Sequence, residues 1–122
     1  MINRPDVIIN CAAVTDTDLC EKEPELAYRV NALGARNLSI VARKIGAKMV
    51  QISTDDVFDG IRHTPYTEFD DTNPKTVYGR SKRAGENYVK EFTYEWVKML
   101  NGDVLNISKI NRADVRRKIL ES

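Results

Sequence analysis

Two short apolar runs separated by a long helical pattern constrain the fold of this chain most strongly. The first run is DVIINCAA, residues 6–13, which is continuous and rich in β-branched residues, as expected of a central parallel strand buried on both faces. The second run, KMVQIS at residues 48–53, is also short and β-branched. Two such strands joined by a helix predict a βαβ unit.

The segment between the two runs has the pattern of one long helix. Apolar residues recur at roughly helical intervals from Leu26 to Ile45. Pro24 suits the first turn of a helix, and Gly46 suits a stop. We therefore expect a helix from about Glu23 to Ile45.

The chain after the second strand begins with a loop and continues with another helix. Residues 54–74 are rich in Asp, Thr, Gly and Pro and predict an extended loop. Loops that follow the carboxyl ends of parallel strands are where α/β sheets bind ligands. We expect the next helix over residues 77–92, and the pattern leaves open whether it continues to Leu100.

The last thirty residues have the weakest pattern. Alternating apolar positions favour a short strand around residues 104–107, and Asn111 is a good first residue for a terminal helix. Basic residues of that helix stand four positions from acidic ones, which is typical of a solvated helix face rather than a nucleic-acid contact. Residues 93–122 therefore stay without an assignment.

Composition excludes several classes of function. The 19 basic and 18 acidic side chains leave a formal net charge of +1, which gives no argument for nucleic-acid binding. The apolar runs are too short to cross a membrane, and the first residues do not resemble a signal peptide, so we expect a cytoplasmic protein. No metal site is expected, because the single histidine is His63 in a loop and the two cysteines, Cys11 and Cys20, form no CxxC motif.

Thr54, Tyr78 and Lys82 form the strongest candidate for chemistry. The threonine follows the second strand, and the tyrosine and lysine lie one helical turn apart near the start of a helix. A tyrosine can protonate a carbonyl oxygen that receives a hydride if its pKa falls from about 10 toward neutrality, and a nearby lysine cation favours that fall. The threonine hydroxyl would hold the same oxygen.

A second tyrosine–lysine pair at the same spacing, Tyr94 and Lys98, shows that spacing alone is a weak motif. The alternative interpretation of either pair is that its two residues lie on a helix surface and have no chemical role. The first pair differs in its context, because it follows the strand end ISTD and contains Gly79, which we expect to let a ligand approach the helix backbone. We therefore favour Tyr78 and assign no chemical role to Tyr94, whose neighbours Trp96 and Leu100 we expect to be packing residues.

Four longer segments, in order along the chain, carry a family pattern. They are PDVIINCAAVTDTDLCEKEPELAYRVNALGARNL, GAKMVQISTDDVFDG, PYTEFDDTNP and VYGRSKRAGENYVKEF. Together they resemble the extended short-chain dehydrogenase/reductases, and closely the dTDP-4-dehydrorhamnose reductase family. The resemblance implies an α/β fold, a partial Rossmann-like parallel sheet with flanking helices. On this basis residues 1–92 are a partial NAD(P)-binding reductase domain, and residues 93–122 are an unassigned C-terminal segment.

The resemblance also implies an activity and roles for residues. The family reduces the 4-keto group of a dTDP-sugar with NADPH or NADH, in dTDP-L-rhamnose biosynthesis. Tyr78 resembles the proton donor, Lys82 the residue that binds the nicotinamide ribose and tunes Tyr78, and Thr54 the hydroxyl at the reacting carbonyl. Asn31 matches a family asparagine, with plain burial as the alternative. The implied cofactor contacts are Ala13, Val14, Thr15, Ile52, Tyr78 and Lys82, and the implied substrate contacts are Thr54 and Asp55.

The chain departs from the family pattern at three places. The six glycines never take the GxxGxxG spacing of the family's pyrophosphate turn. Asp56 stands where the family usually has tyrosine, and its carboxylate would repel a nucleotide diphosphate. Residues after Phe92 do not follow the family. We therefore expect a reductase that is truncated at both ends, and the sequence leaves its activity as an isolated chain open.

Two functions remain open at this point. The first is a reductase that uses NADPH or NADH and a dTDP-sugar. The second is a non-catalytic regulatory or binding protein on the same fold, as in the regulatory subunit of methionine adenosyltransferase. Two or three strands of a larger sheet would leave open edges and apolar faces, so we also expect self-association.

Overall fold

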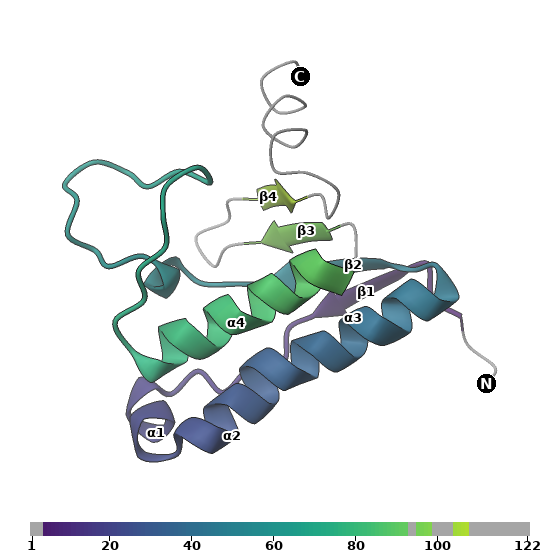
Figure 1. The fold of residues 1–122 in the computed structure, drawn as a ribbon, viewed down its shortest axis with the longest axis horizontal. Helices are drawn as coiled ribbons and strands as arrows, with labels where there is room; N and C mark the ends of the chain where they lie inside the picture. The colour runs from purple at the N-terminus through teal and green to yellow at the C-terminus, as the bar shows by residue number, and fades with distance from the viewer. Residues whose placement is uncertain (1–3, 93–94, 99–103, 108–122) are drawn as a thin grey trace.

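The computed structural model describes residues 4–92, 95–98 and 104–107, and its elements alternate between strands and helices (Figure 1). The strands are β1 (Val7–Asn10), β2 (Lys48–Ile52), β3 (Glu95–Lys98) and β4 (Val104–Ile107). The helices are α1 (Thr17–Lys22), α2 (Pro24–Tyr28), the π-helical turn η1 (Arg29–Leu33), α3 (Gly34–Ile45), the 3-10 turn η2 (Asp55–Val57) and α4 (Val77–Phe92).

The predicted βαβ unit is confirmed. β1 and β2 pair in parallel, with Ile8 opposite Met49 in the register, and β2 also pairs in parallel with β3. β4 runs antiparallel to β3, so the described sheet has four strands in the order β1-β2-β3-β4, rather than the two or three expected. The fold is α/β and Rossmann-like. The separation of residues 93–122 as a segment of their own stays a prediction.

The long predicted helix is also confirmed, with an irregularity in its middle. α2, η1 and α3 follow one another without a break, with Pro24 in the first turn and Gly46 at the end. Gly46 has a φ of 73° and returns its N–H to the last turn, as a glycine after a helix commonly does. The patterns did not predict α1, whose first turn is capped by Asp16.

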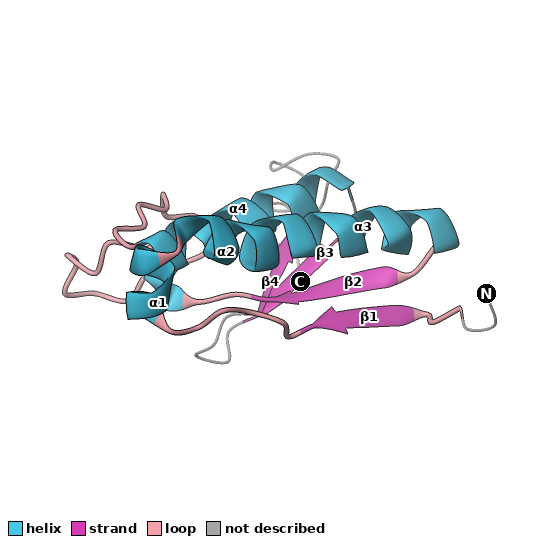
Figure 2. Cartoon of the chain, turned by 90° about the horizontal axis from the view of Figure 1, so that it is seen from below, coloured by secondary structure: helices cyan, strands magenta, loops and turns pink. Residues whose placement is uncertain are grey.

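The helices α3 and α4 lie on one face of the sheet (Figure 2). The core between these helices and the sheet is built from Ala35, Ala42, Met49 and Val89, with Ile8, Leu38 and Ala47 packed against it. α4 comes close to η1 and to the start of α3 at Gly85, where a Cβ atom would meet the backbone oxygen of Asn31 and lie 3.4 Å from the Ala35 side chain. Small residues therefore occupy this helix contact, while the larger apolar residues of the helical pattern lie around it.

One expectation about secondary structure is wrong, and one question that the sequence left open is answered. β1 is not buried on both faces, since Val7 is 46% and Ile9 is 62% exposed. The reason is that β1 is an edge strand of the described sheet and that α3 and α4 cover one face only. α4 does not continue to Leu100, because it ends at Phe92 and residues 95–98 pair with β2 instead.

The strand expected near residues 104–107 is present as β4, and the terminal helix expected from Asn111 lies outside the described residues. Among the described helices, none is long and apolar enough to cross a membrane.

Candidate active site

Thr54, Tyr78 and Lys82 meet where the carboxyl end of β2 faces the first turns of α4. Thr54 is 1% exposed, and Tyr78 and Lys82 are each 4% exposed. The Thr54 side chain hydrogen-bonds to Tyr78, and the Lys82 Nζ atom donates to the Ile52 carbonyl oxygen at 2.7 Å. The structure therefore brings together the three residues that the sequence singled out.

The local sequence explains how Thr54 is held. β2 ends at Ile52, and Thr54 is the capping residue of η2, where its Oγ1 atom accepts the Asp56 N–H at 3.2 Å. The same hydroxyl donates to the Asp55 carboxylate at 3.4 Å. Asp55 itself is exposed, and Ile52 is half-buried. The predicted substrate contacts thus lie on a capped turn at the strand end.

Gly79 has a different role from the one we expected. A Cβ atom at this position would collide with the Asp56 carbonyl oxygen and come within 3.1 Å of the Pro74 side chain. The space that we assigned to a ligand is therefore filled by the protein's own backbone. The expectation is wrong because the glycine permits close packing of η2 against α4, which is the second common use of glycine on a helix.

The pKa of Tyr78 moves in the direction opposite to the one that proton donation near neutral pH requires. Burial raises it most, Thr54 hydrogen bonding lowers it, and the nearby Asp56, Cys20 and Asp55 raise it further. In this structure the Lys82 ammonium faces the Ile52 carbonyl. The electrostatics of the described residues alone therefore keep Tyr78 a neutral phenol.

Burial also affects Lys82. It lowers the pKa of the ammonium, while the charges of Glu86 and Cys11 raise it. Cys11 is an exposed free thiol directly after β1. Lys82 is therefore held close to three groups of different kinds, which are a carbonyl, a carboxylate and a thiol.

The Ala13–Thr15 segment, which the resemblance places at the cofactor, is fixed by Asn31. The Asn31 Oδ1 atom accepts the Val14 N–H at 2.8 Å, and its Nδ2 atom donates to the Val14 carbonyl at 3.1 Å. The same Nδ2 atom donates to Ser81 at 3.0 Å, and Ser81 donates to the Tyr78 carbonyl at 2.9 Å. Asn31 therefore joins the segment after β1 to α4.

The position of Asn31 depends on the π-helical turn. Asn31 lies in the middle of η1 and is 1% exposed. A π-helical turn adds a residue to the helical repeat and re-aims the side chains near it, and such turns are frequent at functional sites. Both interpretations of Asn31 therefore hold together, since it is buried and it also orders the predicted site.

Ser53 and Glu86 also take part in the site, and our sequence reasoning missed them. The Ser53 hydroxyl donates to the Glu86 carboxylate, which is 3% exposed and also pairs with Arg83 at 2.7 Å. The signal for Glu86 was its place four residues after Lys82, on the same helix face as Tyr78. A glutamate in a charged helix normally indicates a solvent-facing position, so the residue type did not predict the burial of Glu86.

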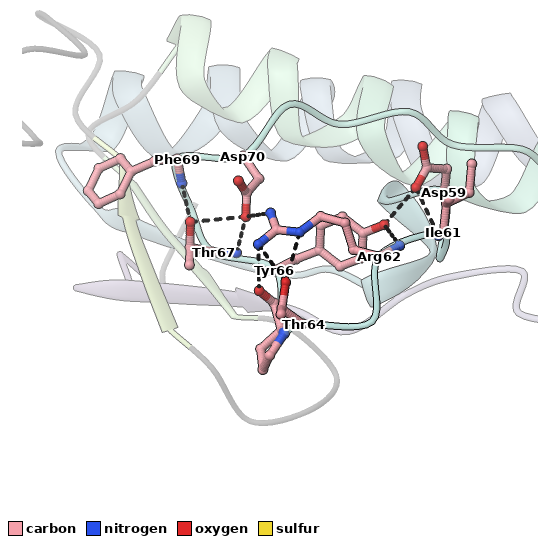
Figure 3. A network of polar contacts seen from close by, with 9 residues as sticks. Asp59, Ile61, Arg62, Thr64, Tyr66, Thr67, Phe69 and Asp70 are labelled. Carbon is pink, nitrogen blue, oxygen red and sulfur yellow. Dashed lines mark hydrogen bonds and ion pairs between the residues drawn. The ribbon is translucent and has the colours of Figure 1, made fainter.

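The loop between the strand end and α4 has its own polar network (Figure 3). Tyr66 stacks on Phe58 with 4.5 Å between ring centroids and donates its hydroxyl to Asp59 at 2.6 Å. Arg62 lies over the Tyr66 ring and pairs with Asp70 at 2.7 Å. Hydrogen bonding lowers the pKa of Asp59, mainly through Tyr66, and of Asp70, mainly through the Thr67 N–H. These contacts shape residues 58–73 into an ordered loop.

The end of this loop is tied back to its beginning. The Asn73 N–H donates to the Val57 carbonyl at 2.9 Å, and its side chain donates to Asp59 at 3.2 Å. The chain thus returns beside η2 before α4 begins. As a result, Thr54 and Tyr78 come together although 23 residues separate them in the sequence.

The residues present fit one end of a dinucleotide better than they fit a metal ion. Among the described residues, no cluster of three His, Cys, Asp or Glu side chains could hold a metal. Ala13 and Val14 are half-buried and Thr15 is exposed, so this segment has surface available beside the strand ends. Polar groups at the carboxyl ends of parallel strands are the usual place for a nucleotide.

Comparison with known proteins identifies related sequences. The chain is 47% identical to the spore coat polysaccharide biosynthesis protein SpsK of Bacillus subtilis over 71% of this chain and 31% of that protein. It is 51% identical to the dTDP-4-dehydrorhamnose reductase of Streptomyces griseus over 73% of this chain and 29% of the enzyme. The chain thus spans about a third or less of the curated relatives that it matches.

Solved structures agree with the fold. The crystal structure of the Bacillus anthracis dTDP-4-dehydrorhamnose reductase in complex with NADP superposes with a TM-score of 0.77 at 48% identity, over 79% of this chain and 35% of that chain. The family model described as the RmlD substrate binding domain matches residues 2–102. These residues make up most of the chain, which therefore belongs to the RmlD substrate binding domain family.

Proposed function

We propose that this chain carries the proton-donating part of an NADPH- or NADH-dependent reductase that acts on the 4-keto group of a dTDP-sugar. The observation that carries the proposal is the meeting of Thr54, Tyr78 and Lys82 at the carboxyl end of β2. The names of the relatives support it, since one is a dTDP-4-dehydrorhamnose reductase and another was solved with NADP. These names favour a reductase over the regulatory alternative.

The residues would divide the work as follows. The nicotinamide, when bound, supplies a hydride to the carbonyl carbon. Tyr78 then gives its phenolic proton to the carbonyl oxygen, while the Thr54 hydroxyl donates a hydrogen bond to that oxygen. Lys82 and the Ala13–Thr15 segment would hold the nicotinamide end, with Ile52 beside them, and Asp55 would contact the sugar. The printed sequence contains no GxxGxxG turn for the pyrophosphate.

Binding must change the Tyr78 environment for this chemistry to run near neutral pH. The described residues hold the pKa of Tyr78 above its usual value, mainly through burial. A cation that moves toward the phenol would lower it, and Lys82 is the nearest candidate on the same helix face. We propose that Lys82 leaves the Ile52 carbonyl when a ligand enters.

The test is NADPH oxidation with the dTDP-4-keto sugar, followed by absorbance, for the wild type and for Tyr78→Phe. We expect Tyr78→Phe to lower kcat by roughly 10²–10⁴-fold, because a positioned general acid contributes that much. Tyr88→Phe is the matched control, since Tyr88 lies on the same helix and contacts Arg36 through its ring. Equal turnover by wild type and Tyr78→Phe, including none by either, would overturn the proposal for this chain.

We also propose that copies of the chain associate. The support is the exposed apolar surface at the edge strand β1, where Val7 and Ile9 are 46% and 62% exposed. Light scattering should give a mass above 13.9 kDa that falls with dilution, and Ile9→Lys should shift it toward the monomer. A monomer at all concentrations would refute this part. The cytoplasmic location stays a prediction.

A further inference from the structure

We propose that Glu86 is a positioning residue for the Thr54, Tyr78 and Lys82 site. Through Ser53 it fixes the end of β2, and its carboxylate favours the ammonium form of Lys82, which lies one helical turn earlier on the same face. The catalytic meaning of this inference rests on the proposed reductase function, whereas its structural and electrostatic content does not.

The first support is an ordered set of contacts between the end of β2 and α4. Three successive residues reach the same helix. The Ile52 carbonyl accepts from Lys82 at 2.7 Å, the Ser53 hydroxyl donates to Glu86, and the Thr54 side chain hydrogen-bonds to Tyr78. Tyr78, Lys82 and Glu86 are four residues apart and therefore lie on one face of the helix. Glu86 supplies the middle contact of the three.

The second support is the burial of Glu86. Glu86 is 3% exposed, and Ser53 is fully buried. A buried carboxylate is costly unless it is paired and hydrogen-bonded, and an apolar residue of similar size often serves stability equally well. Both oxygen atoms of Glu86 are used, one by Ser53 and the other by Arg83 at 2.7 Å. Glu86 is thus a buried carboxylate with one partner for each oxygen atom. We take this arrangement as support for a role beyond filling space.

The third support is the set of charges around Lys82. From α4 it faces Glu86, whose other partner is Arg83, and Tyr78 lies one turn earlier on the same helix face. From the segment after β1 it faces the Cys11 thiol. From β2 it faces the Ile52 carbonyl, which has no charge to titrate. Burial lowers the pKa of Lys82, and the charge of Glu86 opposes this more than that of Cys11 does. Without Glu86, the larger of the two charges that oppose the effect of burial on Lys82 would be lost.

Two substitutions separate the hydrogen bond from the charge. Glu86→Gln keeps the size of the side chain and an oxygen that accepts from Ser53, but it removes the charge. Ser53→Ala removes the hydrogen bond and keeps the charge. If Glu86 acts on Lys82 through its charge, only the first substitution changes the protonation of Lys82 directly. If the two substitutions change the protonation of Lys82 equally, Glu86 acts on Lys82 through the position of the strand end and not through its charge.

The experiment is an NMR titration of the Lys82 Cε and Nζ signals in the 122-residue chain, assigned with Lys82→Met. We expect Glu86→Gln to lower the Lys82 pKa by about one unit, since an opposite charge nearby shifts a pKa by about 1–3 units and Arg83 already compensates part of this charge. Ser53→Ala should leave it close to the wild-type value. Glu91→Gln, an exposed change on the same helix, is the control and should have no effect.

A variant with the opposite sign guards against loss of folding in Glu86→Gln. Arg83→Gln removes the second partner of Glu86 and should raise the Lys82 pKa, because the carboxylate then acts on Lys82 alone. Arg83 is 20% exposed at its side chain, so this change is less disruptive than one in the core. Unchanged Lys82 titration in Glu86→Gln, or in Arg83→Gln when Glu86→Gln does not fold, would overturn the inference.

The titration needs neither cofactor nor sugar, so its outcome is independent of the proposed activity. If turnover is absent but Lys82 shifts as expected, the reductase proposal fails and the Glu86 inference stands. If Tyr78→Phe abolishes turnover but Lys82 does not shift, Glu86 loses its role and the reductase proposal stands. The two proposals therefore fail separately.

Discussion

Two ion pairs with the same separation show how differently two regions of this molecule use charge. The Arg83–Glu86 and Arg62–Asp70 pairs both have 2.7 Å between nitrogen and oxygen. The first pair lies on the buried side of α4, where the Glu86 side chain is 4% exposed. The second lies on the loop of residues 58–73, where the exposures are 43% and 28%. Geometry alone therefore does not rank them, because solvent decides what each polar contact is worth.

The largest expected effect comes from breaking the buried region at Asn31. Asn31→Ala leaves the Val14 backbone and Ser81 without three hydrogen bonds. Each unsatisfied buried group costs about 1–3 kcal/mol, and water can reach part of Val14, so we expect a loss of about 3 kcal/mol in the free energy of unfolding. Urea unfolding followed by circular dichroism measures this value. Asn37→Ala, on the exposed side of α3, should cost far less, and an equal cost in both would contradict the argument.

The next effect tests the close approach of the helices. Gly85→Ala places a methyl group against the Asn31 backbone oxygen. Overpacking of this kind costs about 1–3 kcal/mol, so we expect a lower denaturation midpoint. Gly34→Ala is the matched control, because the nearest atom is 3.7 Å from its Cβ position and alanine favours a helix. A Gly85→Ala protein as stable as Gly34→Ala would show that the contact between η1 and α4 adjusts easily.

A smaller effect is expected on the exposed side of the comparison. Arg62→Met removes the ion pair with Asp70 and the contact with the Tyr66 ring. Exposed pairs contribute up to about 1 kcal/mol, so the loss should stay below that and shrink further at high salt. Thermal unfolding at low and high salt measures it, with Arg43→Met on α3 as the control. A loss of free energy of unfolding as large as that of Asn31→Ala would contradict this expectation and show that the loop contributes as much to stability as the buried site does.

The smallest effect on stability is expected at Asp56. The folded pKa of Tyr78 is raised, so its contribution to stability is present below about pH 10 and is lost as pH rises through the folded value. Asp56→Asn removes one charge that raises this pKa, so Tyr78 should ionise at lower pH while stability at neutral pH stays the same. Ultraviolet titration of tyrosinate measures the shift. Asp71→Asn should not move it, and equal titration curves for wild type and Asp56→Asn would remove Asp56 from the site.

The sequence predicted those parts of the fold that depend on local patterns. Pro24 and Gly46 marked the ends of the long helix, and the β-branched run at residues 48–53 marked β2. The meeting of Thr54 with Tyr78 was also predictable, because a strand end and a helix start in a βαβ fold occupy the same edge of the sheet.

The remaining features depend on tertiary contacts that no local pattern contains. The exposure of Val7 and Ile9 depends on which face of the sheet the helices cover. The burial of Glu86 depends on Ser53, which is 33 residues away. The raised pKa of Tyr78 depends on burial and on Asp56 brought close by the packing at Gly79. In each case the sequence pattern had indicated the opposite.

The hydrogen bonds between Asn31 and the Val14 backbone make the exchange rate of the Val14 amide a measure of local opening. The Val14 amide lies in a segment without helix or strand, yet its proton is held by a side chain from the middle of a helical run. Its exchange with deuterium must await an opening that releases Asn31, rather than the ordinary fluctuation of a loop. If the Val14 amide exchanges slowly while its neighbours exchange fast, its exchange rate reports how often η1 separates from the segment after β1.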